Sequence, residues 1–136
     1  MKNIFTFSLV AIFISVFYTG CIKENTGYDE NYWLSQEQGK VVYSDYCDYF
    51  VVETAYGYNI LRALSSYKPP EGTIVYGNFS NYGVRDFYNR LSRRIFTADV
   101  KEYSLSYNGA QQAVYYYCPY GRNQFNKASS DTTSRK

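Results

Sequence analysis

The sequence predicts an all-β domain: a small, strongly bent antiparallel sheet or barrel of about six strands, followed by one C-terminal helix. Short runs rich in Val, Ile, Tyr and Phe alternate with turn residues along most of the chain. The 136 residues include 18 Tyr and 9 Phe, and aromatic residues favour strands. Near the C-terminus the apolar spacing changes from two residues to about 3.6, which indicates a helix.

The first expected element of the domain is a short helical turn over residues 31–39, with Asn31 as its cap and Gly39 as its stop. Within it, Trp33 and Leu34 are expected to plug one end of the core. Three strands then follow, at residues 40–44, 49–54 and 58–64. The loop 65–72 interrupts the sheet, because its two prolines cannot donate to a strand ladder. Three more strands are expected at residues 73–79, 84–89 and 95–105.

The last element is a helix from about Asn108 to Cys118, capped by Ser106 or Asn108 and ended by Pro119. Its buried face is predicted from an i, i+3, i+4, i+7 spacing of Ala110, Ala113, Val114 and Tyr117. Six short strands with one such helix resemble oligonucleotide/oligosaccharide-binding (OB) or SH3-like barrels. An open sheet with the helix packed on one face is the alternative.

The N-terminal residues have the pattern of a targeting segment. Lys2 precedes an apolar run over residues 4–18, shorter than the roughly 20 residues that a membrane-spanning helix needs. The run ends in Tyr18-Thr19-Gly20-Cys21, which resembles the lipobox of bacterial lipoproteins, except that Tyr18 stands where Leu is commonest. The alternative is an ordinary signal peptide followed by a chance cysteine.

The resemblance to small uncharacterised lipoproteins of Gram-negative envelopes implies that Cys21 carries lipid and begins the mature chain. The chain would then be held on a membrane through its N-terminal lipid, on the periplasmic side or at the cell surface. The expected organisation is a signal peptide at 1–20, a polar linker at 21–31, a single β-rich domain at 32–119 and a disordered tail at 120–136.

Two cysteines remain once Cys21 is assigned to lipid. Outside the inner membrane, where conditions are oxidising, Cys47 and Cys118 are expected to form one disulfide. Two free buried thiols are the alternative. The chain has no His, and two thiolates are too few ligands for zinc, so we expect no metal or other cofactor.

The many tyrosines of the sequence allow two interpretations. On strands it can simply cover a thin core, since its ring is apolar and its tip polar. Alternatively, tyrosines form a contact surface, because they bury much area at low entropic cost. The candidate contact residues are Tyr67, Tyr82, Arg85 and Tyr88, and the expected partner is an envelope protein or a glycan.

Catalysis is not expected. Ser-His-Asp and Cys-His mechanisms need the His that the chain lacks, and no phosphate-binding glycine loop occurs. A net charge of +2 is far from the basic footprint of a nucleic-acid-binding protein. Arg85, Arg90, Arg93 and Arg94 lie close together in sequence; they form a basic patch, a face complementary to the acidic residues 21–56, or a solvated edge.

The sequence therefore predicts a lipid-anchored, non-enzymatic binding or accessory module of the cell envelope. The alternative is an inhibitor or binder of an envelope hydrolase or of a glycan. A purely structural envelope protein is a third class.

Overall fold

The computed structural model describes residues 29–122 and 125, and its strands close into an antiparallel barrel. In chain order the elements are α2 (Glu30–Leu34), β1 (Glu37–Ser44), β2 (Tyr49–Thr54), β3 (Gly57–Ala63), β4 (Ile74–Gly77), β5 (Gly83–Asn89), β6 (Arg94–Leu105) and α3 (Tyr107–Tyr117). The all-β prediction with one C-terminal helix is confirmed, and the closed barrel decides against the open sheet.

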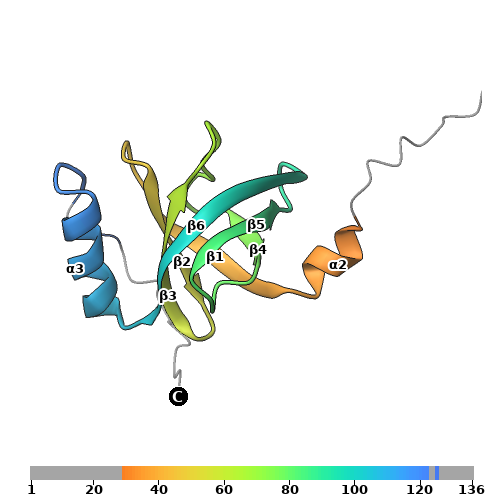
Figure 1. Ribbon diagram of the computed structural model, residues 1–136, viewed down its shortest axis with the longest axis horizontal. Coiled ribbons are helices and arrows are strands. Elements are labelled where there is room, and N and C mark those ends of the chain that lie inside the picture. Colours follow the sequence, from red (N-terminus) through yellow and green to blue (C-terminus); the bar gives the residue numbers. More distant parts are fainter. Residues whose placement is uncertain (1–28, 123–124, 126–136) are drawn as a thin grey trace, which may run out of the picture.

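The barrel consists of two meanders, β1-β2-β3 and β4-β5-β6. They join along both edges, because β3 pairs with β6 and β1 pairs with β4. The chain passes from one meander to the other through the loop that contains Pro69 and Pro70, where the sequence predicted a break. Figure 1 shows α3 on one side of the barrel and α2 on the other.

Strand β2 has the predicted bounds, whereas β1 begins three residues earlier than expected, at Glu37. The added residues pair with β4, which the sequence does not reveal. Strand β4 is shorter than predicted and ends at Gly77. Phe79 therefore lies beyond β4, and its side chain is buried in the barrel interior.

The predicted helical turn is also shorter, and its cap and stop were wrong. Asp29 caps α2, because its carboxylate accepts a hydrogen bond from the Asn31 amide at 3.0 Å. Residues 29–31, expected in the linker, thus belong to the helix and its cap. Gly39 lies in β1, where a side chain would collide with Val52.

Aromatic rings fill the barrel interior. Phe87 stacks on Phe79 at 4.9 Å and on Phe96 at 5.7 Å between ring centroids, and Phe50 contacts Phe96 at 6.2 Å. Aliphatic side chains from alternate strand positions complete this cluster, among them Val41, Val52, Leu61, Val75 and Val100. A first core thus lies inside the barrel.

A second core lies between α3 and the outer face of β1-β2-β3. Ala110, Ala113 and Val114 of α3 pack there with Tyr43, Val51, Tyr58 and Ile60. Val41 faces the interior whereas Tyr43 faces α3, because the register shifts between them. This β-bulge lets one strand supply both cores. Ser106 caps α3, as one of the two predicted caps, by accepting from the Gly109 amide at 3.1 Å.

Phe125 of the predicted disordered tail is packed on the domain. Phe125 is buried beside Tyr58 and Tyr107, with ring centroids at 5.7 and 5.4 Å. The Tyr107 hydroxyl donates to the Phe125 carbonyl at 2.8 Å. The prediction was wrong here because Phe125 completes the second core, which composition alone does not reveal. Residues 123–124 and 126–136 lie outside the described residues.

Polar contacts fix the turn between β1 and β2. The Arg122 side chain pairs with Asp45 at 3.5 Å and with Glu71. Hydrogen bonds from the Arg122 and Tyr46 amides lower the pKa of Asp45. Lys68 donates to the carbonyls of Asp45 and Cys47, and its burial lowers its pKa. Part of the acidic first third therefore does meet basic residues of the later chain.

A disulfide joins Cys47 in this turn to Cys118 at the end of α3, with 6.0 Å between their Cα atoms. It ties α3 to the barrel, as the sequence predicted.

Replacing Cys47 with Ser should destabilise the oxidised protein by about 4 kcal/mol, because the bridge constrains the unfolded chain over a separation of 71 residues. Urea unfolding with and without reductant measures this loss. The reduced wild type is the control and should unfold at the same urea concentration as the variant. Equal midpoints for oxidised wild type and variant would contradict the prediction.

Candidate functional site

The predicted contact residues do not form one surface. Tyr82 is 64% exposed in the turn between β4 and β5, where its ring contacts Tyr103 at 4.7 Å between centroids. The Arg85 guanidinium donates to the carbonyls of Asn81 and Tyr82 at 3.4 and 3.5 Å. Tyr82 and Arg85 thus lie together, while Tyr67 and Tyr88 have other roles.

Tyr88 is completely buried, so its assignment to the contact face was wrong. Its ring stacks on Trp33 at 6.1 Å between centroids, and its hydroxyl donates to Glu30 at 3.1 Å. Tyr88 therefore holds α2 against the outer face of β5. Trp33, expected to plug one end of the core, covers Tyr88 on the outside of the barrel instead.

Tyr67 is half-buried and holds the long loop on the barrel. Its ring packs edge-on against Phe96 at 5.6 Å, with the Arg94 guanidinium 4.7 Å from the ring centroid. Its hydroxyl accepts a hydrogen bond from the buried Asn89 amide at 2.6 Å. These contacts engage most of the Tyr67 side chain, so its role is structural.

A hollow of about 430 Å³ lies between α2 and the start of β5, and we call it the aromatic hollow. Rings of Tyr32 and Trp33 form one wall, edge to face at 5.3 Å between centroids. Arg85 and Asp86 of β5 also line this hollow. The remaining lining residues are Gln36, Gly77, Asn78 and Val84.

The aromatic hollow combines ring faces with hydrogen-bonding groups of both kinds. Arg85 only donates, Asp86 only accepts, and the amides of Gln36 and Asn78 do both. Such a mixture suits the binding of a polar ligand that also has an apolar face. Sequence reasoning found Arg85 but missed Tyr32, Trp33 and Asp86. The available signal was the single Trp of the chain, next to Tyr on a short helix.

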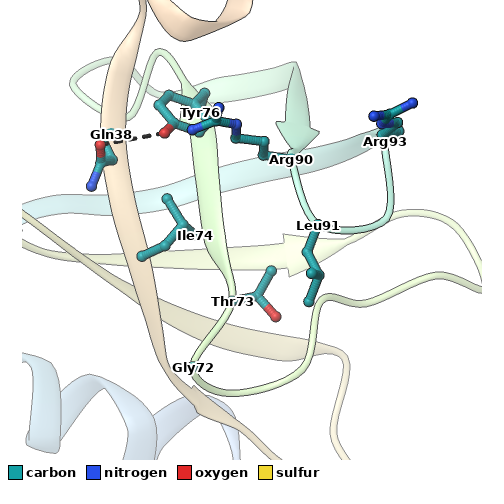
Figure 2. Close-up of a pocket in the computed structure, with 8 residues that line it drawn as sticks. All are labelled: Gln38, Gly72, Thr73, Ile74, Tyr76, Arg90, Leu91 and Arg93. Carbon is teal, nitrogen blue, oxygen red and sulfur yellow. Dashed lines mark hydrogen bonds between the residues drawn. The ribbon is translucent and has the colours of Figure 1, made fainter.

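A second hollow, of about 690 Å³, lies beside the turn between β5 and β6, and we call it the basic hollow. Figure 2 shows Arg90 reaching toward Tyr76, while Arg93 stands at the far end of the turn. The Tyr76 hydroxyl donates to Gln38 at 3.4 Å across its floor. The other lining residues are Gly72, Thr73, Ile74 and Leu91.

The aromatic hollow is lined by residues of β5, and the basic hollow by residues of the turn that follows β5. Asp86 and Tyr88 are two residues apart on β5, so they share one face of the strand. Asp86 lines the aromatic hollow and Arg90 the basic hollow, whereas Tyr88 lies beneath α2. The five-residue α2 borders both hollows, since Tyr32 and Trp33 line the aromatic hollow and Glu30 lies 4.0 Å from Arg90 of the basic hollow.

Other exposed tyrosines gather on the α3 side of the barrel. Tyr115 and Tyr116 point away from the second core, and Tyr120 follows the helix. Sequence reasoning named only the buried face of this helix. Figure 1 places α3 opposite α2, so these rings lie on a different face from the aromatic hollow.

Among residues 29–122 and 125, no group of three or more His, Cys, Asp or Glu side chains is arranged to hold a metal ion. None of the helices in the described part of the chain is long and apolar enough to span a membrane. The predicted lipidation site, Cys21, lies outside the described residues. The chain matches no protein-family model, no curated protein and no solved structure.

Alanine substitutions should affect stability differently at Tyr88 of β5 and at Tyr82 in the turn before β5. Tyr88→Ala should lower the free energy of unfolding by about 3–5 kcal/mol, because it empties the space beneath Trp33. Tyr82→Ala should change it by no more than about 0.5 kcal/mol, because most of that ring is exposed. Urea unfolding measures both, and equal losses would contradict the assignment of Tyr82 to the surface.

Proposed function

We propose that this protein is a lipid-anchored, non-enzymatic binding module of the cell envelope that binds its partner at the aromatic hollow. The observation that carries the proposal is the hollow itself, which Tyr32 and Trp33 of α2 line together with Arg85 and Asp86 of β5. Aromatic residues and arginine are enriched in protein recognition patches.

The anchor is proposed from the Tyr18–Cys21 segment and its resemblance to a lipobox. Lipid on Cys21 would hold the chain at a membrane without any membrane-spanning helix. The domain would then act on partners that reach this membrane surface, as an accessory or inhibitory subunit does.

A glycan is the second candidate ligand, and the shape of the aromatic hollow favours it. An aromatic ring presents an apolar face on which the C–H face of a sugar ring can stack. Carboxylate, amide and guanidinium groups beside such a ring can bond to hydroxyl groups from several directions. A concave site with these groups suits a sugar better than a flat protein surface.

Lipidation is tested by Cys21→Ser. In cells fed radiolabelled palmitate, the wild-type chain should carry label and sediment with membranes, and Cys21→Ser should lose the label. Cys47→Ser is the matched control, because it removes a cysteine of the disulfide and should keep the label. Label retained in Cys21→Ser would contradict the proposed anchor.

Partner binding is tested by cross-linking and affinity capture of the full chain from intact cells. The double variant Tyr32→Ala, Arg85→Ala should reduce capture of the wild-type partner at least tenfold, a loss of about 1.4 kcal/mol. The matched control is Tyr115→Ala, Tyr116→Ala, which removes two equally exposed rings from α3. This control should capture the partner at the wild-type level.

The reverse result, with capture lost only in the α3 variant, would move the contact surface from the aromatic hollow to α3. Capture of one stoichiometric hydrolase would identify an inhibitor or accessory subunit. Calorimetric titration with envelope sugars distinguishes the second candidate, since saturable binding lost in Tyr32→Ala, Arg85→Ala would identify a glycan ligand.

A further inference from the structure

The turn between β5 and β6 exposes an apolar side chain among cations. Leu91 at its tip is 87% exposed. Arg90, Arg93 and Arg94 around it are also exposed, and Ile95 follows at 39%. At this exposure Leu91 contributes little to the stability of the barrel, and its side chain is accessible to a partner.

The turn is held in shape from beneath. The Asn89 side chain is buried, and its carbonyl oxygen accepts from the amides of Leu91 and Ser92 at 2.9 and 3.2 Å. Its amide nitrogen donates to the Tyr67 hydroxyl at 2.6 Å. Because this buried amide is bonded on both sides, the turn presents Leu91 in a fixed direction. Folding has therefore already ordered the turn, so binding costs little further conformational entropy there.

The surroundings of Leu91 suit an anionic surface. It borders the basic hollow, and the described residues that line this hollow include two arginines and no carboxylate. Glu30 lies 4.0 Å from Arg90 and partly offsets its charge, and the Arg94 guanidinium lies 4.7 Å from the centroid of the Tyr67 ring. Arginine forks bind phosphate oxygens in a bidentate manner, which favours a phosphate-bearing partner.

We propose that this turn docks on the phospholipid surface that carries the anchor, with Leu91 inserted among the lipids and the arginines on headgroup phosphates. This inference rests on the proposed lipidation of Cys21. A leucine beside several basic residues is the pattern of an interfacial contact, in which apolar insertion and charge attraction add.

The position of the N-terminus argues for this occupant. Asp29 lies eight positions after Cys21, so an extended chain spans at most about 28 Å between them. Asp29 caps α2, and Glu30 of the same helix lies 4.0 Å from Arg90. Figure 1 shows α2 and the β5–β6 turn on the same side of the barrel, away from α3.

A short tether makes weak docking effective. One leucine and a few arginines would bind a membrane only weakly from solution. Because Asp29 lies within about 28 Å of the anchor and Glu30 beside it lies 4.0 Å from Arg90, the turn meets the lipid surface at a high effective concentration. Docking would fix the orientation of the barrel and turn α3 toward the space beyond the membrane.

The experiment places a photoreactive amino acid at position 91 of the full chain in cells and measures cross-links to lipid. The matched control carries the same amino acid at Tyr116, which is also exposed but lies on α3. We expect at least tenfold more lipid adduct from position 91. Equal adducts at the two positions, or adducts only to protein at position 91, would overturn the proposal.

Charge variants test the role of the arginines. Arg90→Gln with Arg93→Asn should reduce the lipid adduct at position 91 at least fivefold, and asparagine suits the positive φ of 49° at residue 93. Lys40→Gln with Arg62→Gln removes the same charge from exposed strand positions and should leave the adduct unchanged. Equal loss in both pairs would show that only net charge matters and would overturn the arginine contact.

The failure of docking and the failure of anchoring give different results. If the chain stays with membranes but position 91 gives no excess lipid adduct, anchoring holds and docking fails. If the chain does not sediment with membranes, anchoring fails. Sedimentation of the purified full-length Cys21→Ser chain with anionic and with zwitterionic phospholipid vesicles then tests docking alone, with the Arg90→Gln, Arg93→Asn form as reference. If the turn docks, the Cys21→Ser chain should sediment more with anionic than with zwitterionic vesicles, and the form with Arg90→Gln and Arg93→Asn should lack this preference. The same preference in both chains would overturn the docking proposal.

Discussion

The pairing of β1 with β4 is the interaction on which the rest of the structure depends. It involves residues 37–40 of β1 and 74–77 of β4, and it joins two meanders into a closed barrel without free edges. Beyond this segment, the β-bulge near Val42 changes the face of the sheet to which the side chains of β1 point. Val41 therefore lies inside the barrel and Tyr43 outside it. One strand thus closes the barrel and also begins the second core.

Closure decides where a ligand can bind. Stacked phenylalanines occupy the interior, so the binding surfaces lie on the outer face. Helix α3 packs on the outer face of β1-β2-β3, and Phe125 completes this second core. The β4-β5 side has only the short α2, which reaches Tyr88 and leaves a hollow at each end.

The two proposals fit one orientation of the molecule. Asp86 lies on β5, and Arg90 lies four residues later, at the start of the β5–β6 turn. With the basic turn on a lipid surface, the aromatic hollow would lie farther from the bilayer, within reach of envelope partners. The tether, the β5–β6 turn and the aromatic hollow would then lie in this order with increasing distance from the membrane. The buried Tyr88–Trp33 contact would keep α2 in place against β5.

The sequence by itself determined the elements whose signals are local. Strand alternation, the Pro69-Pro70 break, the Ser106 cap and the helix spacing all depend on neighbouring residues, and the elements they predict are present. Compartment reasoning likewise paired Cys47 with Cys118. Tertiary structure decided what depends on distant residues: barrel closure, the burial of Tyr88 and Phe125, and the hollow beside Trp33. A tyrosine on a strand has the same local pattern on either face, and only the helix packed above it decides whether it is core or surface.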